Sequence, residues 1–92
     1  MLYIICYDIS DNRARYRVVK ALQGYGVRIQ KSVFECPDLT EQQLLELQEK
    51  LEAYIDHGED SVYYLRICRA CVKEIEWSGL GRKAQDEPFR VV

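Results

Sequence analysis

The first apolar run of the chain predicts a buried strand. Residues 2–8, written LYIICYD, are rich in Tyr and Ile, are too few for a stable helix, and precede a Ser-Asp-Asn cluster. Successive side chains of a strand point to opposite faces, so the even positions from Leu2 to Asp8 share one face. We therefore expect the Asp8 carboxylate at the carboxyl end of this strand, in line with core side chains, where it needs a compensating partner. The alternative is that Asp8 only caps the next turn.

Two later segments have the 3.6-residue spacing of amphipathic helices. The first extends from about Asn12 to Gln23, capped by Ser10 or Asp11, and its polar side carries the basic residues Arg13, Arg17 and Lys20. The second begins with a capping box formed by Thr40 and Gln43 and continues to about Ile55. Its outer face is acidic, so we expect this helix to face away from any phosphate; the acids are Glu41, Glu46, Glu49 and Glu52.

The remaining apolar segments predict further strands at 27–36, 61–69 and 72–77. The first alternates less cleanly than the others, which predicts a bend or bulge along its length. The order of elements indicates an α+β, ferredoxin-like βαββαβ sandwich: an antiparallel sheet with two helices on one face. The fourth strand is supplied either by splitting Val27–Cys36 or by Val72–Trp77, and we favour Val72–Trp77.

The whole chain, residues 1–92, is short enough to form a single domain with one modest core. Residues 79–92 are predicted to form a C-terminal loop and a short apolar strand that adds to an existing sheet edge, its own or a partner's. The strand at 61–69 carries bulky side chains on both faces. One face of the sheet is therefore expected to meet a second sheet in a dimer.

Charge is distributed unevenly along the chain. The net charge of −2 argues against a protein with a basic surface overall. However, six basic residues lie within nineteen positions, 13–31, that contain no acid, whereas nine acids lie between Glu35 and Asp60 beside Lys50 alone. One face of the molecule is therefore expected to attract phosphate while another repels it.

The sequence contains no apolar run long enough to span a membrane and begins without the features of a signal peptide, which predicts a cytoplasmic protein with no membrane partner. Its four cysteines are then expected to be reduced. Two of them, Cys68 and Cys71, form a C-x-x-C pair, but with His57 as the one histidine this is weak evidence for zinc, although a dimer could supply four thiolates.

Two sequence blocks carry a resemblance to a known family. Tyr7-Asp8-Ile9 with the arginine-bearing helix after it, and Arg28 to Glu35 (RIQKSVFE), resemble the small CRISPR-associated endonuclease family, the second of the two universal CRISPR adaptation proteins. The resemblance covers nearly the whole chain. It implies a ferredoxin-like protomer, a homodimer whose sheets face each other, and a C-terminal strand added to the partner's sheet. It also implies that the two copies of Asp8 lie near the two-fold axis.

The same resemblance implies a site and an activity. Asp8 would be the metal ligand, and two copies related by symmetry would share one Mg²⁺ ion. The arginines would hold phosphate, and the aromatic residues would orient the site or pack on a base or on the dimer interface. The implied residues are Tyr7, Asp8, Arg15, Arg17, Arg28 and Phe34. As single residues, Tyr7 and Phe34 are equally consistent with core packing and Arg28 with a surface position on a strand.

The expected function is magnesium-dependent endonucleolytic hydrolysis of RNA or DNA phosphodiester bonds in CRISPR adaptation, the acquisition of spacers. The alternative is an architectural dimer that binds DNA and bridges subunits of the CRISPR spacer integrase without cleaving. A ferredoxin-like module that senses a small molecule rests on fold analogy alone. Toxin-type ribonucleases related to the same family are a further alternative.

Overall fold

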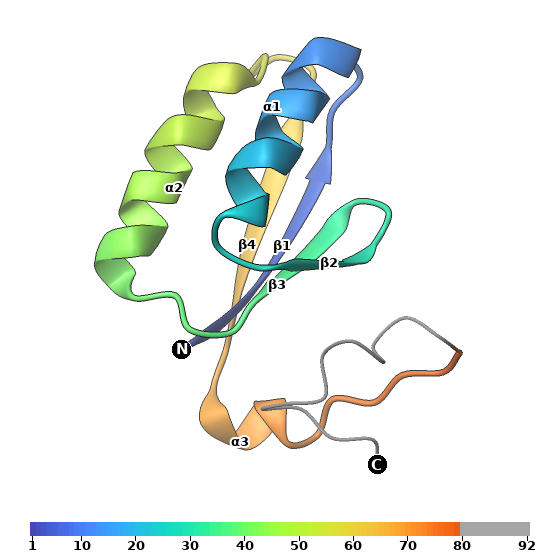
Figure 1. Cartoon of the computed structure of the whole chain (residues 1–92), viewed down its shortest axis with the longest axis vertical. Coiled ribbons are helices and arrows are strands. Elements are labelled where there is room, and N and C mark those ends of the chain that lie inside the picture. The colour runs from blue at the N-terminus through green and yellow to red at the C-terminus, as the bar shows by residue number, and fades with distance from the viewer. Residues whose placement is uncertain (80–92) are drawn as a thin grey trace.

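The computed structural model describes residues 1–79. In chain order, its elements are β1 (Leu2–Asp8), α1 (Asn12–Gln23), β2 (Val27–Gln30), β3 (Val33–Cys36), α2 (Glu41–Tyr54), β4 (Ser61–Ile67) and α3 (Arg69–Val72). Figure 1 shows α1 and α2 side by side on one face of the sheet and α3 beyond the end of β4. Within these residues, no helix has the length and apolarity needed to cross a bilayer.

The four strands form one sheet in the order β2-β3-β1-β4, and every neighbouring pair is antiparallel. β1 lies in the middle and pairs along its whole length with β4, from Leu2 opposite Ile67 to Asp8 opposite Ser61. This is the βαββαβ arrangement of ferredoxin-like folds. The α+β fold predicted from the sequence, with two helices on one face of an antiparallel sheet, is therefore confirmed.

The predicted source of the fourth strand is wrong. Residues 27–36 form two strands joined by a turn at Lys31 and Ser32, and residues 72–77 contain no strand. Two polar residues interrupt the apolar alternation at this turn, and Tyr7 holds it there: its backbone N–H donates to the Ser32 carbonyl (3.1 Å) and its hydroxyl donates to the Lys31 carbonyl (3.1 Å). The expected irregularity is confirmed as a register shift between Arg28 and Gln30.

β4 ends at Ile67, two residues before the predicted end. Cys68 caps the short helix α3, because its Sγ accepts the backbone N–H of Cys71 (3.4 Å). The chain leaves the sheet where α3 begins, and residues 73–79 contain no strand. The predicted C-terminal edge strand, in 79–92, lies outside the described residues apart from Gly79.

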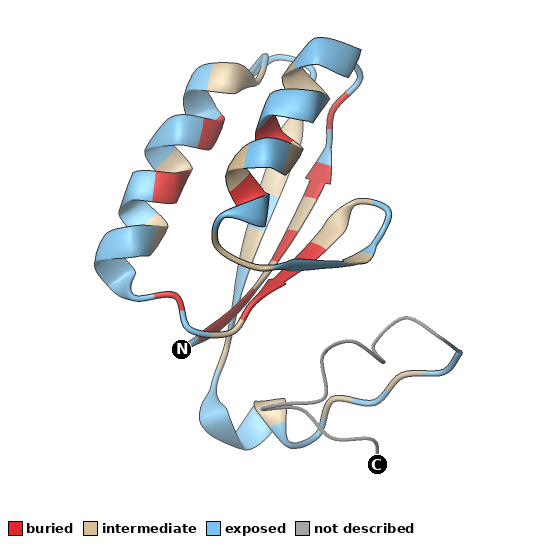
Figure 2. Ribbon diagram, viewed as in Figure 1, coloured by how far each residue is buried: buried red, intermediate tan, exposed pale blue. Residues whose placement is uncertain are grey.

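The hydrophobic core lies between the sheet and the two long helices. Tyr3, Ile5 and Tyr7 of β1 are buried under the helices, together with Phe34 of β3. The helices contribute one buried stripe each, visible in Figure 2 as red segments that face the sheet: Val18, Leu22, Leu47 and Leu51. The helices thus cover the odd positions of β1, and of the even positions only Leu2 at the start of the strand is buried.

The position predicted for the Asp8 side chain is therefore corrected. Asp8 is exposed at the end of β1, on the sheet face that the helices do not cover, where Ile4 and Cys6 are half-buried. The even positions share one face as expected, but the helices cover the other face. The carboxylate consequently remains in water and does not need a buried partner.

The caps at the starts of α1 and α2 are among those predicted from the sequence. Asp11 accepts the backbone N–H of Ala14 (2.8 Å) at the start of α1. Thr40 and Gln43 form the expected capping box at the start of α2, each side chain accepting the backbone N–H of the other residue (3.1 and 3.0 Å). Both helix starts are thus determined by local sequence.

Gly26, the last residue before β2, is required by a close backbone approach. A Cβ at this position would lie 2.0 Å from the Glu35 carbonyl oxygen and 2.7 Å from Cys36 Sγ. Gly24, two residues earlier, has room: its Cβ would lie 3.4 Å from the nearest heavy atom, the Ala21 carbonyl oxygen. Side chains are therefore excluded at Gly26 by space alone.

We predict that Gly26→Ala lowers the free energy of unfolding by about 1–3 kcal/mol, because the Glu35 backbone must move to admit the methyl group. Gly24→Ala is the matched control and should leave stability unchanged or raise it by about 0.4–1 kcal/mol. Urea unfolding followed by circular dichroism at one protein concentration measures both. Equal effects of the two variants would contradict the steric explanation.

Candidate nucleic-acid and metal site

Asp8 lies beside a shallow depression of about 310 Å³ at the carboxyl end of β1. The depression is lined by Tyr7, Asp8, Ile9, Arg15, Lys31 and Ser32. The nearby Asp60 carboxylate is engaged elsewhere, since its Oδ2 accepts the Asp56 N–H (2.8 Å) and its Oδ1 accepts the Ser10 N–H (3.3 Å). Asp8 is therefore the carboxylate that faces this depression.

Arg15 stabilises the turn between β1 and α1. Its Nη1 donates to the carbonyl oxygens of Ile9 (2.7 Å) and Ser10 (3.5 Å), and its Nη2 donates to Asn12 Oδ1. These acceptors are neutral, so they satisfy the N–H groups of the guanidinium without cancelling its charge. Arg15 consequently fixes the backbone just after Asp8 and leaves a positive charge beside it.

A second group of contacts joins β1 to the β2–β3 hairpin. Arg28 Nη2 donates to the Tyr7 hydroxyl (3.5 Å), and the Arg28 guanidinium lies 5.7 Å from the centre of the buried Phe34 ring. The rings of Tyr7 and Phe34 pack against each other at 6.3 Å. Tyr7 and Phe34 therefore position the Arg28 guanidinium from its core side.

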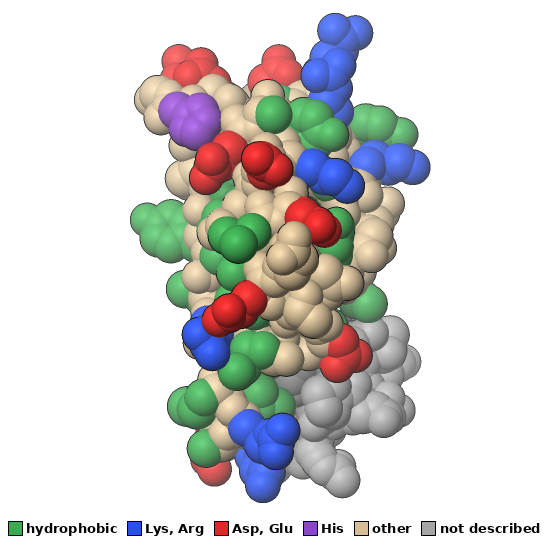
Figure 3. Space-filling view, turned by 90° about the vertical axis from the view of Figure 1, so that its left-hand side faces the viewer, with side chains coloured by type: hydrophobic (Ala, Val, Ile, Leu, Met, Phe, Trp, Pro, Cys, Tyr) green, Lys and Arg blue, Asp and Glu red, His purple; other side chains and the backbone are tan. Residues whose placement is uncertain are grey.

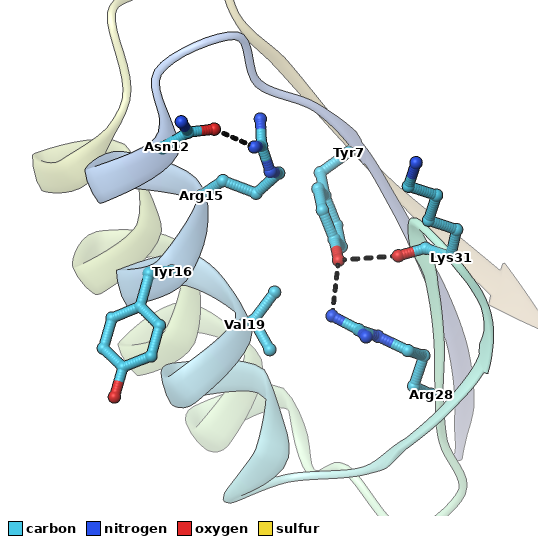
Figure 4. A pocket seen from close by; sticks show the side chains of 7 residues that line it. All are labelled: Tyr7, Asn12, Arg15, Tyr16, Val19, Arg28 and Lys31. Atoms are coloured by element: carbon cyan, nitrogen blue, oxygen red, sulfur yellow. Dashed lines mark hydrogen bonds between the residues drawn. The ribbon is translucent and has the colours of Figure 1, made fainter.

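Tyr7 and Arg28 also border a groove of about 340 Å³ between α1 and the hairpin. Figure 4 shows the Arg28 side chain pointing toward Tyr7 and the Tyr16 side chain pointing away from the groove. The groove is lined by Tyr7, Asn12, Arg15, Tyr16, Val19, Arg28 and Lys31. It adjoins the Asp8 depression, because Tyr7, Arg15 and Lys31 line both.

The structure brings four of the six candidate residues together. Tyr7, Asp8, Arg15 and Arg28 line the two adjoining hollows. Phe34 is completely buried beneath Arg28, whereas Arg17 is exposed and lines neither hollow.

Six further residues line the hollows without being among the predicted candidates, and they include Lys31 and Asn12. Lys31 belongs to the basic stretch 13–31, and recognising the hairpin turn would have pointed to it. Asn12 had no signal beyond following the cap of α1.

The electrostatics of the molecule favour an anion at these hollows. Within residues 1–79, none of the basic side chains from Arg13 to Lys31 forms an ion pair, whereas Arg66 lies 3.9 Å from Glu41. Figure 3 views the molecule from the side of α2 and shows acidic side chains spread along this face. The acids of α2 are exposed as predicted: Glu41, Glu46, Glu49 and Glu52. This charge distribution favours an anion at α1 and the hairpin over the acidic face of α2.

A metal site in one chain would be incomplete. Residues 1–79 contain no cluster of three or more His, Cys, Asp or Glu side chains. Magnesium prefers oxygen ligands and in phosphate-processing sites uses one or two carboxylates together with waters and phosphate oxygens. The exposed Asp8 carboxylate beside cationic hollows fits such a donor set, provided that further ligands come from a second copy or from substrate.

Comparison with known proteins identifies the family. The family model described as CRISPR associated protein Cas2 matches residues 1–75. The chain belongs to the Cas2 family. A relative from Chloroflexus aurantiacus, named CRISPR-associated endoribonuclease Cas2 1, is 42% identical over 82 residues, covering 88% of this chain and 87% of the relative. A Cas2 endoribonuclease from Mycobacterium tuberculosis is 37% identical over 90 residues, covering 97% of this chain and 75% of the relative.

Solved structures of the Cas2 family share the fold. The crystal structure of Streptococcus pyogenes Cas2 matches with a TM-score of 0.74 and 28% identity, covering 86% of this chain and 100% of that one. A chain in a partial Cas6-RT-Cas1–Cas2 complex matches with a TM-score of 0.67 and 26% identity, covering 77% of each chain. The family resemblance inferred from the two sequence blocks is thereby confirmed.

Arg15→Ala should lower the free energy of unfolding by about 1–2 kcal/mol, because it removes charged hydrogen bonds to the turn. Arg17→Ala on the same helix removes an equal charge without such bonds and should change stability by less than about 0.5 kcal/mol. Thermal and urea unfolding of both variants measure the difference. If the two variants lose stability equally, Arg15 does not hold the turn.

Proposed function

We propose that this Cas2-family protein is an endonuclease that hydrolyses phosphodiester bonds, with RNA as the favoured substrate, in CRISPR adaptation. The observation that carries the proposal is the exposed Asp8 carboxylate beside Arg15 and Lys31, neither of which forms an ion pair within residues 1–79. A carboxylate next to a phosphate-binding surface is the arrangement that metal-assisted hydrolysis requires. The similarity to proteins named endoribonucleases supports RNA as the substrate.

The site is completed by a second copy of the chain. The sheet face that carries Asp8 is open and partly apolar: Tyr63 is 63% exposed and Leu65 45% exposed, with Ile4 and Cys6 opposite them. Covering this face with an identical sheet would bury these side chains and bring two Asp8 carboxylates to one interface. In the proposed dimer, residues 79–92 add a C-terminal strand to the partner's sheet.

Each residue then has a defined task. The two Asp8 carboxylates would hold a magnesium ion, which supplies an activated water and neutralises charge on the phosphate when bound. Arg28 and Lys31 bind the substrate phosphates along the groove. Arg15 keeps the turn after Asp8 in place, and Tyr7 fixes both the Arg28 guanidinium and the hairpin turn.

Asp8→Asn should reduce magnesium-dependent cleavage of labelled RNA by about 100-fold or more, because the neutral amide is a much weaker metal ligand. The matched control is Asp38→Asn, an exposed aspartate that follows β3 at the opposite end of the sheet. Cleavage of RNA, single-stranded DNA and duplex DNA is measured with magnesium and with chelator. Identical, chelator-resistant cleavage by wild type and Asp8→Asn would refute the proposal.

A second candidate function is an architectural one, in which the dimer binds duplex DNA and bridges spacer-integrase subunits without cleaving. The observation that favours it is the structural similarity to a chain solved in a complex with Cas1. The cations of the groove would serve this role equally well, because phosphate contacts position a duplex without reading its sequence. Asp8 would then be dispensable for binding.

For this second candidate, Arg28→Ala should weaken duplex binding and reduce the slope of log K against log salt by about one unit, through loss of one phosphate contact. Arg66→Ala is the control, since Arg66 pairs with Glu41 at the other end of the sheet. Binding is measured by fluorescence anisotropy at several salt concentrations. DNA affinity that survives Asp8→Asn favours the architectural role, and absence of affinity at low salt excludes it.

A further inference from the structure

Two cysteines lie together at the point where the chain leaves the sheet. Cys68 directly follows β4 and caps α3, and Cys71 lies within α3. Both side chains are exposed, and Cys68 Sγ accepts the backbone N–H of Cys71 at 3.4 Å. Cys6 and Cys36 differ from this pair, because they lie within strands and Cys36 is completely buried. The proposed nuclease site uses none of these thiols.

The contacts of the pair make its two sulfurs chemically different. The pKa of the Cys68 thiol is lowered, mainly because the Cys71 backbone N–H donates to Cys68 Sγ and, to a smaller extent, because the Cys71 thiol does so as well. The pKa of Cys71 is raised, first because its S–H is bonded to the Cys68 sulfur and second because of the Cys68 charge. Two exposed neighbouring thiols, one with a lowered and one with a raised pKa, are the arrangement of a reactive dithiol.

We propose that Cys68 and Cys71 form a reversible dithiol–disulfide pair in which Cys68 is the attacking sulfur. The oxidant is a small-molecule disulfide such as oxidised glutathione. The Cys68 thiolate attacks one glutathione sulfur, forms a mixed disulfide and releases the other glutathione as a thiolate, which takes up a proton. Cys71 then loses its proton to water and attacks Cys68 Sγ, which releases the second glutathione. The protein dithiol has lost two electrons, and one oxidised glutathione has become two reduced molecules.

A zinc site is the competing use of a C-x-x-C pair. Structural zinc needs four ligands, and within residues 1–79 no third His, Cys, Asp or Glu joins Cys68 and Cys71. One chain therefore does not complete a zinc site within residues 1–79, and zinc held by the pairs of two chains is an outcome that the test below distinguishes.

The proposal is tested by incubating the full-length protein with oxidised glutathione and analysing the cysteines by alkylation and peptide mass spectrometry. In the wild type, a Cys68–Cys71 disulfide should form and be reversed by dithiothreitol. Cys71→Ser should instead accumulate one glutathione on Cys68, because the second attack cannot occur. Cys68→Ser should react with glutathione at least roughly tenfold more slowly than Cys71→Ser.

Cys36 provides an internal reference, because burial raises the pKa of its thiol to about 11 and it should remain unmodified in the folded protein. Circular dichroism of each serine variant verifies that it is folded. Three results would overturn the proposal: glutathione trapped on Cys71 rather than Cys68, no disulfide in the wild type, or a bound zinc ion whose removal by chelator is needed before either thiol reacts. None of these measurements depends on nuclease activity, so the proposal and the proposed function can fail separately.

Discussion

The alternation of β1 is the constraint on which the arrangement of the molecule depends. This strand is hydrogen-bonded on both sides, to β3 and β4, so the direction of each of its side chains is fixed by the sheet. Tyr7 and Asp8 are neighbours in sequence yet serve opposite faces: the tyrosine packs into the core and the aspartate remains in solvent. A one-residue slip in register would bury the carboxylate and expose the aromatic ring.

Much of the fold could be predicted from local sequence because the signals were local. Thr40 with Gln43 specifies the start of α2 regardless of tertiary context, and Asp11 does the same for α1. The division of residues 27–36 into two strands depends instead on a long-range contact, the bond from Tyr7 to the Lys31 carbonyl, which a linear pattern does not contain. The fourth strand was misassigned for the same reason.

The candidate site was only partly predictable. Asp8, Arg15 and Arg28 could be proposed from the resemblance of their sequence blocks, and they lie around adjoining hollows. The sequence did not show that Arg15 donates hydrogen bonds to the backbone carbonyls of Ile9 and Ser10. Nor did it show that the buried Phe34 ring packs against the Arg28 guanidinium. The alternation correctly placed Asp8 on the same face as the other even positions of β1. It did not show which face the helices cover, so that face was wrongly expected to be the core face.

The exposure of Asp8 separates the proposed chemistry of this chain from its folding. The carboxylate has no place in the buried core, so replacing it by another small polar residue leaves the packing of the sheet and helices intact. If cleavage depends on Asp8 as proposed, a single substitution there would remove it while the sheet, the basic groove and the sheet face that the helices do not cover persist. A scaffold and a catalyst can therefore share one ancestor and one architecture.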